Sequence, residues 1–391
     1  DRNEITIEGS TSLAFTEDVG KRFQAYGWTV QNVENGEDTA AIAQAIDNAK
    51  ADTAHPSLII VRTEIAHGTP KANKASAHGE PLGADALKAM REFYQWNEEP
   101  FAVPEDVKAY FAELQKGYSK QHAEYDAMFK TYQKAYPELY LKWQAWHEKK
   151  LPEALKNDPR LFSASEPKAT RIVSGEALNL FAEYLPNLFG GSADLAPSNK
   201  TELKGKGFFG VENRVGANIH FGIREFAMAA ICNGIQLYGG FHAYCATFLV
   251  FTDYLKPALR LSAIMHQPVV YVMTHDSIGV GEDGPTHQPI EHLAALRATP
   301  DVLVFRPADA KETAYSYIMA FEAEKPSVLA LTRQNLPQYP ETGDGTYKGG
   351  YILKDTKKGK PDVILMASGS EVELIYNAAD QLEAEGIKTR V

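Results

Sequence analysis

The sequence predicts an α/β fold built from consecutive domains, each with a parallel sheet sandwiched by helices. Short runs rich in Ile and Val alternate with segments whose apolar residues recur at helical spacing, and strands that alternate with helices form parallel sheets. The chain has 391 residues, which at ~150 residues per domain corresponds to two to three domains.

The composition excludes several classes of protein. The formal net charge is −11, whereas a nucleic-acid-binding surface needs a basic face. No stretch reaches the ~18 uninterrupted apolar residues of a membrane span. The two cysteines, Cys232 and Cys245, form no Cys-x-x-Cys pair, so a reducing cytoplasm fits best. Small anionic substrates remain compatible, because a few local Arg and His side chains can override the global charge.

The first domain is expected over residues 1–150. Its alternating apolar residues predict a strand over 1–9, a helix over 16–26, a strand over 28–33, a helix over 37–50, a strand over 57–63 and a loop over 66–83. A long helical region follows from Pro104 to about residue 148, broken at Pro137. Its aromatic face fits a coiled coil, a stacking surface for bases or a packed connector. The short run of heptads favours the connector.

A linker over 151–168 precedes a second α/β domain, expected over residues 169–340. Its elements are a helix over 172–184, a strand over 187–195, a helix over 224–237 and strands over 268–274, 302–306 and 328–332. A linker rich in Gly, Lys and Asp, residues 341–361, leads to a third unit over 362–391. This unit has a strand over 363–366 and a helix over 371–384. Two strands cannot close a core, so we expect the third domain to be incomplete.

The densest polar segment, residues 274–289, follows a buried strand and so lies at the carboxyl end where open α/β sheets bind ligands. It matches the Gly-x-Gly-x-x-Gly pattern, but acidic residues would face a pyrophosphate and no helix follows, which argues against a dinucleotide site. Three interpretations remain open: a polar loop that aims at a hydroxylated substrate, ordinary loop chemistry, or a metal site. The metal site would use His275, Asp283 and His287.

Three further features have both a structural and a functional interpretation. Glu225 is at the start of an apolar helix, where a carboxylate commonly complements the helix dipole. If its carboxyl group were instead buried beside aromatic rings, its pKa would rise and it could act as a neutral hydrogen-bond donor. Phe248, Phe251 and Tyr254 are spaced by three, which is usual in a core. Arg333 follows an apolar strand at its carboxyl end, where a guanidinium can hold a phosphate.

Together these segments resemble those of transketolases, which are thiamine-diphosphate enzymes. The resemblance runs over nearly the whole chain and is carried by residues 3–5, 78–79, 169–171, 190–195, 197–199, 222–228, 247–254, 274–290 and 332–337. It implies a thiamine-diphosphate-binding fold with incomplete first and third domains. Residues 1–150 would be the carboxyl-terminal part of the diphosphate-binding domain, 169–340 the pyrimidine-binding domain and 362–391 the start of the C-terminal domain.

The resemblance also implies roles around the cofactor. Glu225 would hydrogen-bond the pyrimidine ring of thiamine diphosphate and promote the tautomer that removes a proton from the cofactor. A divalent metal, Mg²⁺ or Ca²⁺, would bind the side-chain oxygen of Asn3 and the backbone carbonyl of Ile5. The residues implied to contact the cofactor are Asn3, His78, Asp194, Glu225, Phe248, Phe251 and Tyr254.

For the substrate, the resemblance implies a phosphate site and hydroxyl contacts on a sugar phosphate. The phosphate would lie among Arg171, Ser198, His287 and Arg333, and the hydroxyls would bind His275 and Asp283. His78 would approach both the cofactor and the substrate. The catalytic residues would be Glu225, His275 and His78. The implied reaction, in the pentose phosphate pathway, transfers a two-carbon glycolaldehyde unit through a cofactor-stabilised carbanion. Xylulose 5-phosphate would be the donor and ribose 5-phosphate or erythrose 4-phosphate the acceptor, in a homodimer with shared active sites.

The sequence departs from the family pattern in two places. The family has a metal-binding Gly-Asp-Gly segment some thirty residues before the asparagine that Asn3 matches, so we expect the chain to be truncated at both ends and inactive alone. Ala66-His67 stands where glycine and an aromatic residue are expected. Two alternatives therefore stay open: an enzyme similar to dihydroxyacetone synthase, and an incomplete half that partners a full-length subunit.

Overall fold

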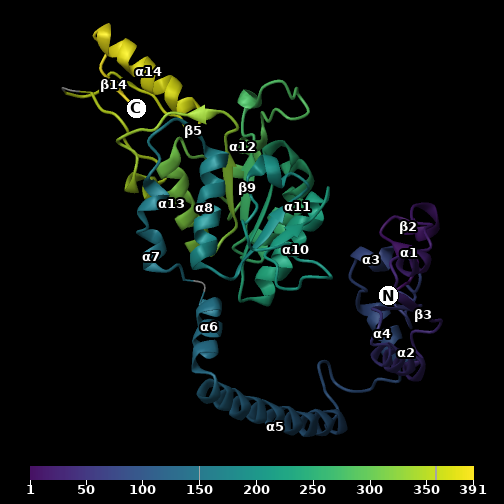
Figure 1. The fold of residues 1–391 in the computed structure, drawn as a ribbon. Helices are drawn as coiled ribbons and strands as arrows, with labels where there is room; N and C mark the ends of the chain where they lie inside the picture. The colour runs from purple at the N-terminus through teal and green to yellow at the C-terminus, as the bar shows by residue number, and fades with distance from the viewer. Residues whose placement is uncertain (149, 357–358) are drawn as a thin grey trace. The chain divides into compact units, whose positions relative to one another are not determined.

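The computed structural model describes residues 1–148, 150–356 and 359–391. The chain forms two compact units, residues 1–123 and residues 124–391. The long helix α5 (Glu105–Ala135) contains the division between them (Figure 1). None of the helices in these described ranges is both long enough and apolar enough to cross a membrane.

The first unit contains a parallel pair of strands flanked by helices. Strands β3 (Thr29–Val33) and β4 (Ser57–Val61) pair in parallel along all five residues. Aspartates at the N-caps begin both α1 and α2, since each carboxylate accepts a hydrogen bond from a backbone N–H of the first turn. The other elements of this unit are β1 (Ile5–Thr6), β2 (Gly9–Ser10), α1 (Val19–Ala25), α2 (Thr39–Ala51), α3 (Ser76–Gly79) and α4 (Ala84–Phe93).

Two predictions for the first unit were wrong in detail. The strand expected over residues 1–9 is a two-residue strand, β1, that turns back to pair with β2. The loop expected over residues 66–83 contains the short helix α3. Helix α4 was not predicted at all; it begins after Gly83, whose φ of 82° ends the preceding loop.

The helical region predicted from Pro104 to residue 148 is present and breaks where expected. Helix α5 ends at Ala135 and α6 (Pro137–Glu148) begins at Pro137, because proline fits the first helical position but cannot continue a helix. The rings of Phe129 and Trp143 lie 5.0 Å apart across this corner. The aromatic residues at the end of α5 therefore pack against α6.

The second unit is built on a six-stranded parallel sheet with the order β10-β11-β9-β8-β6-β7. Its strands are β6 (Leu188–Ser192), β7 (Asn218–His220), β8 (His242–Phe248), β9 (Val270–Thr274), β10 (Leu303–Phe305) and β11 (Ser327–Leu331). Strands β7 and β8 were not predicted: β7 has only three residues, and β8 lacks the Val- and Ile-rich run that marks the neighbouring strands. The parallel sheet and its four predicted strands, β6, β9, β10 and β11, are confirmed.

Two pairs of helices cover the two faces of this sheet (Figure 1). Helices α8 (Thr170–Tyr184) and α13 (Ala310–Glu322) pack on one face, and α10 (Glu225–Tyr238) and α11 (Thr252–Ile264) on the other. Along β8, Tyr244 and Ala246 point into the first layer while Ala243 and Cys245 point into the second. This alternation buries the strand on both faces, as a parallel sheet requires.

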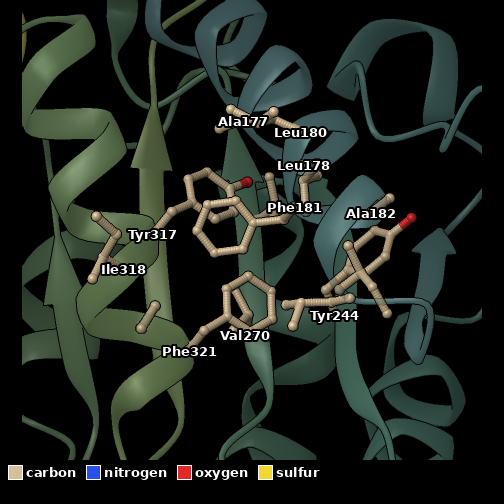
Figure 2. Packing of buried hydrophobic residues seen from close by; sticks show 14 of the residues in the cluster. Ala177, Leu178, Leu180, Phe181, Ala182, Tyr244, Val270, Tyr317, Ile318 and Phe321 are labelled. Atoms are coloured by element: carbon tan, nitrogen blue, oxygen red, sulfur yellow. The ribbon is translucent and has the colours of Figure 1, made fainter. Parts of the chain in front are cut away.

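The layer under α8 and α13 is an aromatic core (Figure 2). The ring of Phe181 lies 5.8 Å from that of Tyr317 and 5.2 Å from that of Phe321. The buried hydroxyl of Tyr317 lies 2.6 Å from Ser174 Oγ, and the hydroxyl of Tyr244 donates to a backbone carbonyl. Each such side chain stabilises the fold by ~1.5–3 kcal/mol, provided that its polar group keeps a partner.

The remaining elements of the second unit are short or belong to its carboxyl-terminal segment. They are α7 (Glu153–Lys156), β5 (Lys168–Ala169), α9 (Ala196–Asn199), α12 (His292–Arg297), β12 (Asn335–Leu336), β13 (Val363–Ile364), α14 (Glu371–Ala384) and β14 (Thr389–Arg390). There are also 3-10 turns at Thr11–Leu13, Pro159–Phe162, Leu249–Phe251, Ile278–Val280 and Asp344–Lys348. The strand and helix predicted after residue 362 are confirmed as β13 and α14.

The strand order creates a switch point at the carboxyl edge of the sheet. The chain leaves β6 toward β7 on one side and leaves β8 toward β9 on the other. Loops that depart in opposite directions leave a crevice between them, and open α/β sheets bind ligands at such crevices.

Candidate active site

Polar and aromatic residues follow four strand ends at this carboxyl edge. Asp194 follows β6, Phe248 ends β8, His275 follows β9 and Arg333 comes two residues after β11. Two of them have a strained backbone, because Asp194 and His275 adopt positive φ angles of 61° and 58°. Strain of this kind is common at functional sites, where the surroundings hold a residue in place.

His275 lies at the centre of the group. Its side chain is buried, with 3% exposure, and its imidazole stacks on the ring of Phe248 at a centroid distance of 3.7 Å. The rings of Phe248 and Phe251 lie nearly parallel, 5.9 Å apart. His287 approaches both rings edge-on, at 6.0 and 5.5 Å. Tyr254 extends the group, 6.1 Å from Phe251.

A chain of buried hydrogen bonds fixes the tautomer of His275. Thr274 Oγ1 donates to Asn199 Oδ1 over 2.7 Å, so its oxygen accepts from His275 Nδ1, 2.8 Å away. The chain continues from Asn199 Nδ2 to Ser192 Oγ over 3.1 Å and on to Thr201 Oγ1 over 2.6 Å. Since Nδ1 carries the proton, the lone pair of Nε2 stays available for a ligand hydroxyl.

The surroundings keep this imidazole neutral. Burial lowers the pKa of His275 to about 4, and the positive charges of Arg171 and Arg333 act in the same direction. The carboxylate of Asp283 opposes the shift. His275 therefore acts at neutral pH as an uncharged acceptor beside two guanidinium groups.

Arg171 and Arg333 form an incomplete anion site. The Nη1 group of Arg171 donates to the carbonyl of Ser198 over 2.8 Å, whereas its Nε is buried without a partner among the described residues. Burial and the nearby charge of Arg333 lower the pKa of Arg171. Two adjacent guanidinium groups with an unsatisfied donor favour a bound anion, and a phosphate accepts such hydrogen bonds well.

The acidic loop does not form the alternative metal site. Asp283 lies on an exposed turn between Gly281 and Gly284. Among groups of three His, Cys, Asp or Glu side chains in the described ranges, only Asp253, Glu291 and His292 bring ligand atoms within 4.8 Å of one another, so His275, Asp283 and His287 do not. No helix follows the glycines in the described residues before α12, whereas a dinucleotide fingerprint opens a helix.

Glu225 opens α10, as predicted, but the structure leaves its carboxyl half-buried. Within residues 1–148, 150–356 and 359–391 that carboxyl has no side-chain hydrogen bond or ion pair. The position suits a carboxylate that complements the helix dipole. A dry environment beside the aromatic rings would require a further surface to cover it.

The site residues predicted in the first unit lie near its amino-terminal turn and in α3. Asn3 Oδ1 accepts a hydrogen bond from the backbone N–H of Ile5 over 3.0 Å, which closes a turn around Glu4 at a φ of 64°. His78 is exposed in α3. Ala66 has a φ of 54°, which explains why glycine is the expected residue there.

Sequence reasoning missed the side chains that support the site. Thr170 and Thr332 join the first turn of α8, which carries Arg171, to the loop that carries Arg333. Asp276 accepts a 2.8 Å hydrogen bond from Arg306 Nε, and the guanidinium also contacts Glu371 at the start of α14. Two features of the sequence could have indicated this second pair: Arg306 is followed by a proline at a strand end, and Asp276 is adjacent to His275.

Three family models match the chain over almost its whole length. The model described as the transketolase thiamine diphosphate binding domain matches residues 1–152. The transketolase pyrimidine binding domain matches residues 166–338, and the transketolase-like C-terminal domain matches residues 349–391.

Relatives and solved structures agree with these matches. A transketolase of Geobacillus stearothermophilus is 47% identical over 399 residues, covering 100% of this chain and 60% of the relative. A chloroplastic transketolase of Solanum tuberosum is 48% identical over 398 residues, covering 100% of this chain and 54% of the relative. The solved R525L mutant of Pichia stipitis transketolase superposes with a TM-score of 0.92 at 43% identity, covering 100% of this chain and 59% of that chain.

Proposed function

Because the chain belongs to the transketolase family, we propose that its function is to transfer a two-carbon glycolaldehyde unit from a ketose phosphate to an aldose phosphate. The chain spans about 60% of the length of the first curated relatives. We therefore expect little turnover from residues 1–391 alone and propose the activity for the complete product of the reading frame that contains them.

The pair of arginines beside His275 is the observation that carries this proposal. The buried Nε of Arg171 has no partner in the described part of the chain, and the charge of Arg333 is near enough to lower the pKa of Arg171. The phosphate of the sugar would bind between these two side chains, with Ser198 and His287 beside them. His275, neutral and with Nε2 available, would accept from a sugar hydroxyl, and so would Asp283.

The substrates proposed are those that the resemblance implied. Pichia stipitis transketolases have been solved with xylulose 5-phosphate, with fructose 6-phosphate and with sedoheptulose 7-phosphate. We propose xylulose 5-phosphate as donor and ribose 5-phosphate or erythrose 4-phosphate as acceptor, in the pentose phosphate pathway. Both cysteines are free and buried, which supports a reducing compartment, and we propose the cytoplasm.

The residues at the carboxyl edge fit thiamine diphosphate. The nearly parallel rings of Phe248 and Phe251, with Tyr254 beyond them, offer a flat apolar wall for an aromatic ring. When bound, the cofactor supplies stabilisation of a carbanion. Glu225 would hold a proton on the pyrimidine ring, Asp194 would contact the cofactor, and the aromatic wall would exclude water.

A second copy of the chain would complete this environment. Helix α10 exposes Phe226, Ile231, Leu237 and Tyr238, of which Tyr238 is 86% exposed. An apolar face of this kind is unusual on a monomer and marks an interface. We propose a homodimer in which the partner covers α10 and gives Glu225 the dry surroundings that its role requires.

The first unit would supply the metal and diphosphate contacts. Asn3 Oδ1 uses one lone pair for its bond to Ile5 N–H and keeps the other. Its amide oxygen and the Ile5 carbonyl are hard donors on one short turn, which suits Mg²⁺ or Ca²⁺. His78, exposed in α3, would reach cofactor and substrate. We propose that the chain contains parts of three domains, over residues 1–150, 169–340 and 362–391.

Two alternatives remain as outcomes of the tests. An enzyme similar to dihydroxyacetone synthase would use the same edge and differ in the acceptor it prefers. A half-protein that completes a full-length subunit would bind that subunit and show no turnover of its own. Measuring transfer to a series of acceptors that includes formaldehyde would identify an enzyme similar to dihydroxyacetone synthase. Activity that appears only when the chain is mixed with a full-length subunit would identify the half-protein.

The sugar-phosphate site can be tested directly by titration calorimetry with ribose 5-phosphate. Arg333→Met should weaken binding at least ten-fold, because a charge-assisted hydrogen bond contributes ~1.5–3 kcal/mol. Arg260→Met is the matched control, since Arg260 is exposed on α11, outside the candidate site. Equal losses in the two variants would contradict the assignment of the phosphate site.

A further inference from the structure

We propose that Asp253, Glu291 and His292 bind a divalent transition-metal ion of the Zn²⁺ class. One donor atom of each side chain lies within 4.8 Å of the others. Asp253 is on the first turn of α11, Glu291 precedes α12 and His292 is the first residue of α12. This site uses none of the residues proposed for cofactor or substrate, so it does not rest on the proposed function.

His292 is the observation that points to a ligand. Its side chain is 5% exposed, and both ring nitrogens are buried without a hydrogen-bond partner in the part of the chain that the structure describes. Nε2 lies 3.2 Å from Asp253 Oδ2, and Nδ1 lies 3.9 Å from Glu291 Oε2. A buried polar group left unsatisfied destabilises the fold, and a bound cation would satisfy the ring nitrogen that coordinates it.

The distances suit coordination. Zinc bonds of about 2.1 Å to nitrogen and oxygen in a tetrahedron place two ligand atoms roughly 3.4 Å apart. The 3.2 Å between Nε2 and Asp253 Oδ2 is close to this value. Glu291 is 73% exposed at its side chain and so is free to rotate toward the ion. The ammonium of Lys256, 3.6 Å from Asp253 Oδ1, leaves Oδ2 for the metal.

The donor set selects the class of ion. An imidazole with two carboxylates favours Zn²⁺ and its transition-metal neighbours over Mg²⁺ and Ca²⁺, which prefer oxygen alone. This difference separates the site from the all-oxygen donors proposed on the turn of Asn3. Excess Mg²⁺ should compete at the turn of Asn3 and leave zinc at His292 in place.

The test is equilibrium dialysis of the metal-stripped chain against Zn²⁺ with excess Mg²⁺, followed by zinc analysis. The unchanged chain should bind one equivalent of zinc. His292→Gln and Asp253→Asn should each weaken zinc binding at least ten-fold. Loss of a residue that only hydrogen-bonds to a metal ligand typically lowers metal affinity 10–100-fold, and loss of a ligand itself should cost at least as much. His266→Gln, which removes an exposed imidazole on the same unit, should bind as the unchanged chain does.

A second measurement distinguishes the loss of a metal ligand from the loss of the fold in a variant. Co²⁺ bound in the same place should give visible absorption that disappears in Asp253→Asn, a near-isosteric change, while the near-ultraviolet circular dichroism stays unchanged. Zinc binding equal in His292→Gln and the unchanged chain would overturn the proposal. So would the absence of stoichiometric zinc binding.

Discussion

Thr332 donates its backbone N–H to Oγ1 of Thr170 over 2.7 Å, and Thr170 returns its own N–H to Oγ1 of Thr332 over 3.1 Å. Both residues are fully buried. This reciprocal pair joins the start of α8 to the loop after β11 across 162 residues of sequence. It holds the first turn of α8, which carries Arg171, against the loop that carries Arg333, so we expect the proposed anion site to depend on these two hydroxyls.

Replacing Thr170 with valine should loosen the contact between the start of α8 and the loop after β11. The variant leaves the backbone N–H of Thr332 buried without its acceptor, which should lower the free energy of unfolding by about 1–3 kcal/mol. Ribose 5-phosphate should bind more weakly as well, because the arginines lose their relative position. Denaturant unfolding and titration calorimetry measure the two effects. Thr131→Val, in which an exposed threonine on α5 loses a bond to its own helix, should change neither strongly.

The neutral state of His275 predicts a dependence of stability on pH. Its pKa is lowered to about 4 in the folded chain, against about 6.5 when unfolded. Between these values the unfolded chain binds the proton and the folded chain does not, so stability is complete above pH 6.5 and falls toward pH 4. The loss is at most ~3 kcal/mol. His275→Gln should flatten the pH profile of unfolding between pH 7 and 5, and an unchanged slope would contradict this account.

The same imidazole should report the anion site. Arg171 and Arg333 help to lower its pKa, so a bound phosphate that neutralises them should raise the pKa again. An NMR titration of the His275 ring with and without inorganic phosphate measures this shift. A pKa that does not respond to phosphate would place the anion elsewhere.

Arg306 connects the active-site strand to the carboxyl-terminal segment. Its side chain is 7% exposed and pairs with the fully buried carboxylate of Asp276; burial raises the pKa of Asp276, and the guanidinium opposes that change. Arg306→Met leaves the buried carboxylate of Asp276 without its partner and should lower the free energy of unfolding by ~3–5 kcal/mol. The double variant with Asp276→Asn should recover part of this loss. Equal losses in the single and double variants would show that the ion pair is not the cause.

The departure at Ala66 predicts a stabilising change. A non-glycine residue in the left-handed region costs roughly 1–2 kcal/mol, and Ala66 has a φ of 54°. Ala66→Gly removes this strain at a smaller cost in unfolded-chain entropy. The Tm of the first unit should rise by a few degrees in calorimetry, whereas Ala45→Gly, inside α2, should lower it.

Much of the fold could be predicted because its signals are local. The Val-rich strand β9 and helix α14 with its apolar spacing carry their patterns in a few consecutive residues, and both are found where expected. Strand β8 was missed for a physical reason. Its residues, among them Cys245 and Ala246, are buried by the helices on both faces of the sheet, so tertiary packing rather than propensity makes it a strand.

The site could be predicted only in part, because its geometry is not local. The motifs pointed to His275, Arg171 and Arg333, and the structure places the charges of the two arginines near the neutral imidazole of His275. The bonds that hold them could not be read from the sequence. Thr274 and Asn199 are 75 residues apart and are neighbours only because β6 and β9 lie on either side of β8.

The central claim is that this chain carries the cofactor and sugar sites of a transketolase. The most direct test measures glycolaldehyde transfer from xylulose 5-phosphate to ribose 5-phosphate by the complete product of the reading frame that contains residues 1–391, with thiamine diphosphate and Mg²⁺. We expect turnover by the unchanged protein and a loss of ~10²–10⁴-fold in Glu225→Gln, the range for a lost proton-transfer group, with ribose 5-phosphate affinity largely kept. No transfer by the unchanged protein, or equal turnover by the variant, would contradict it.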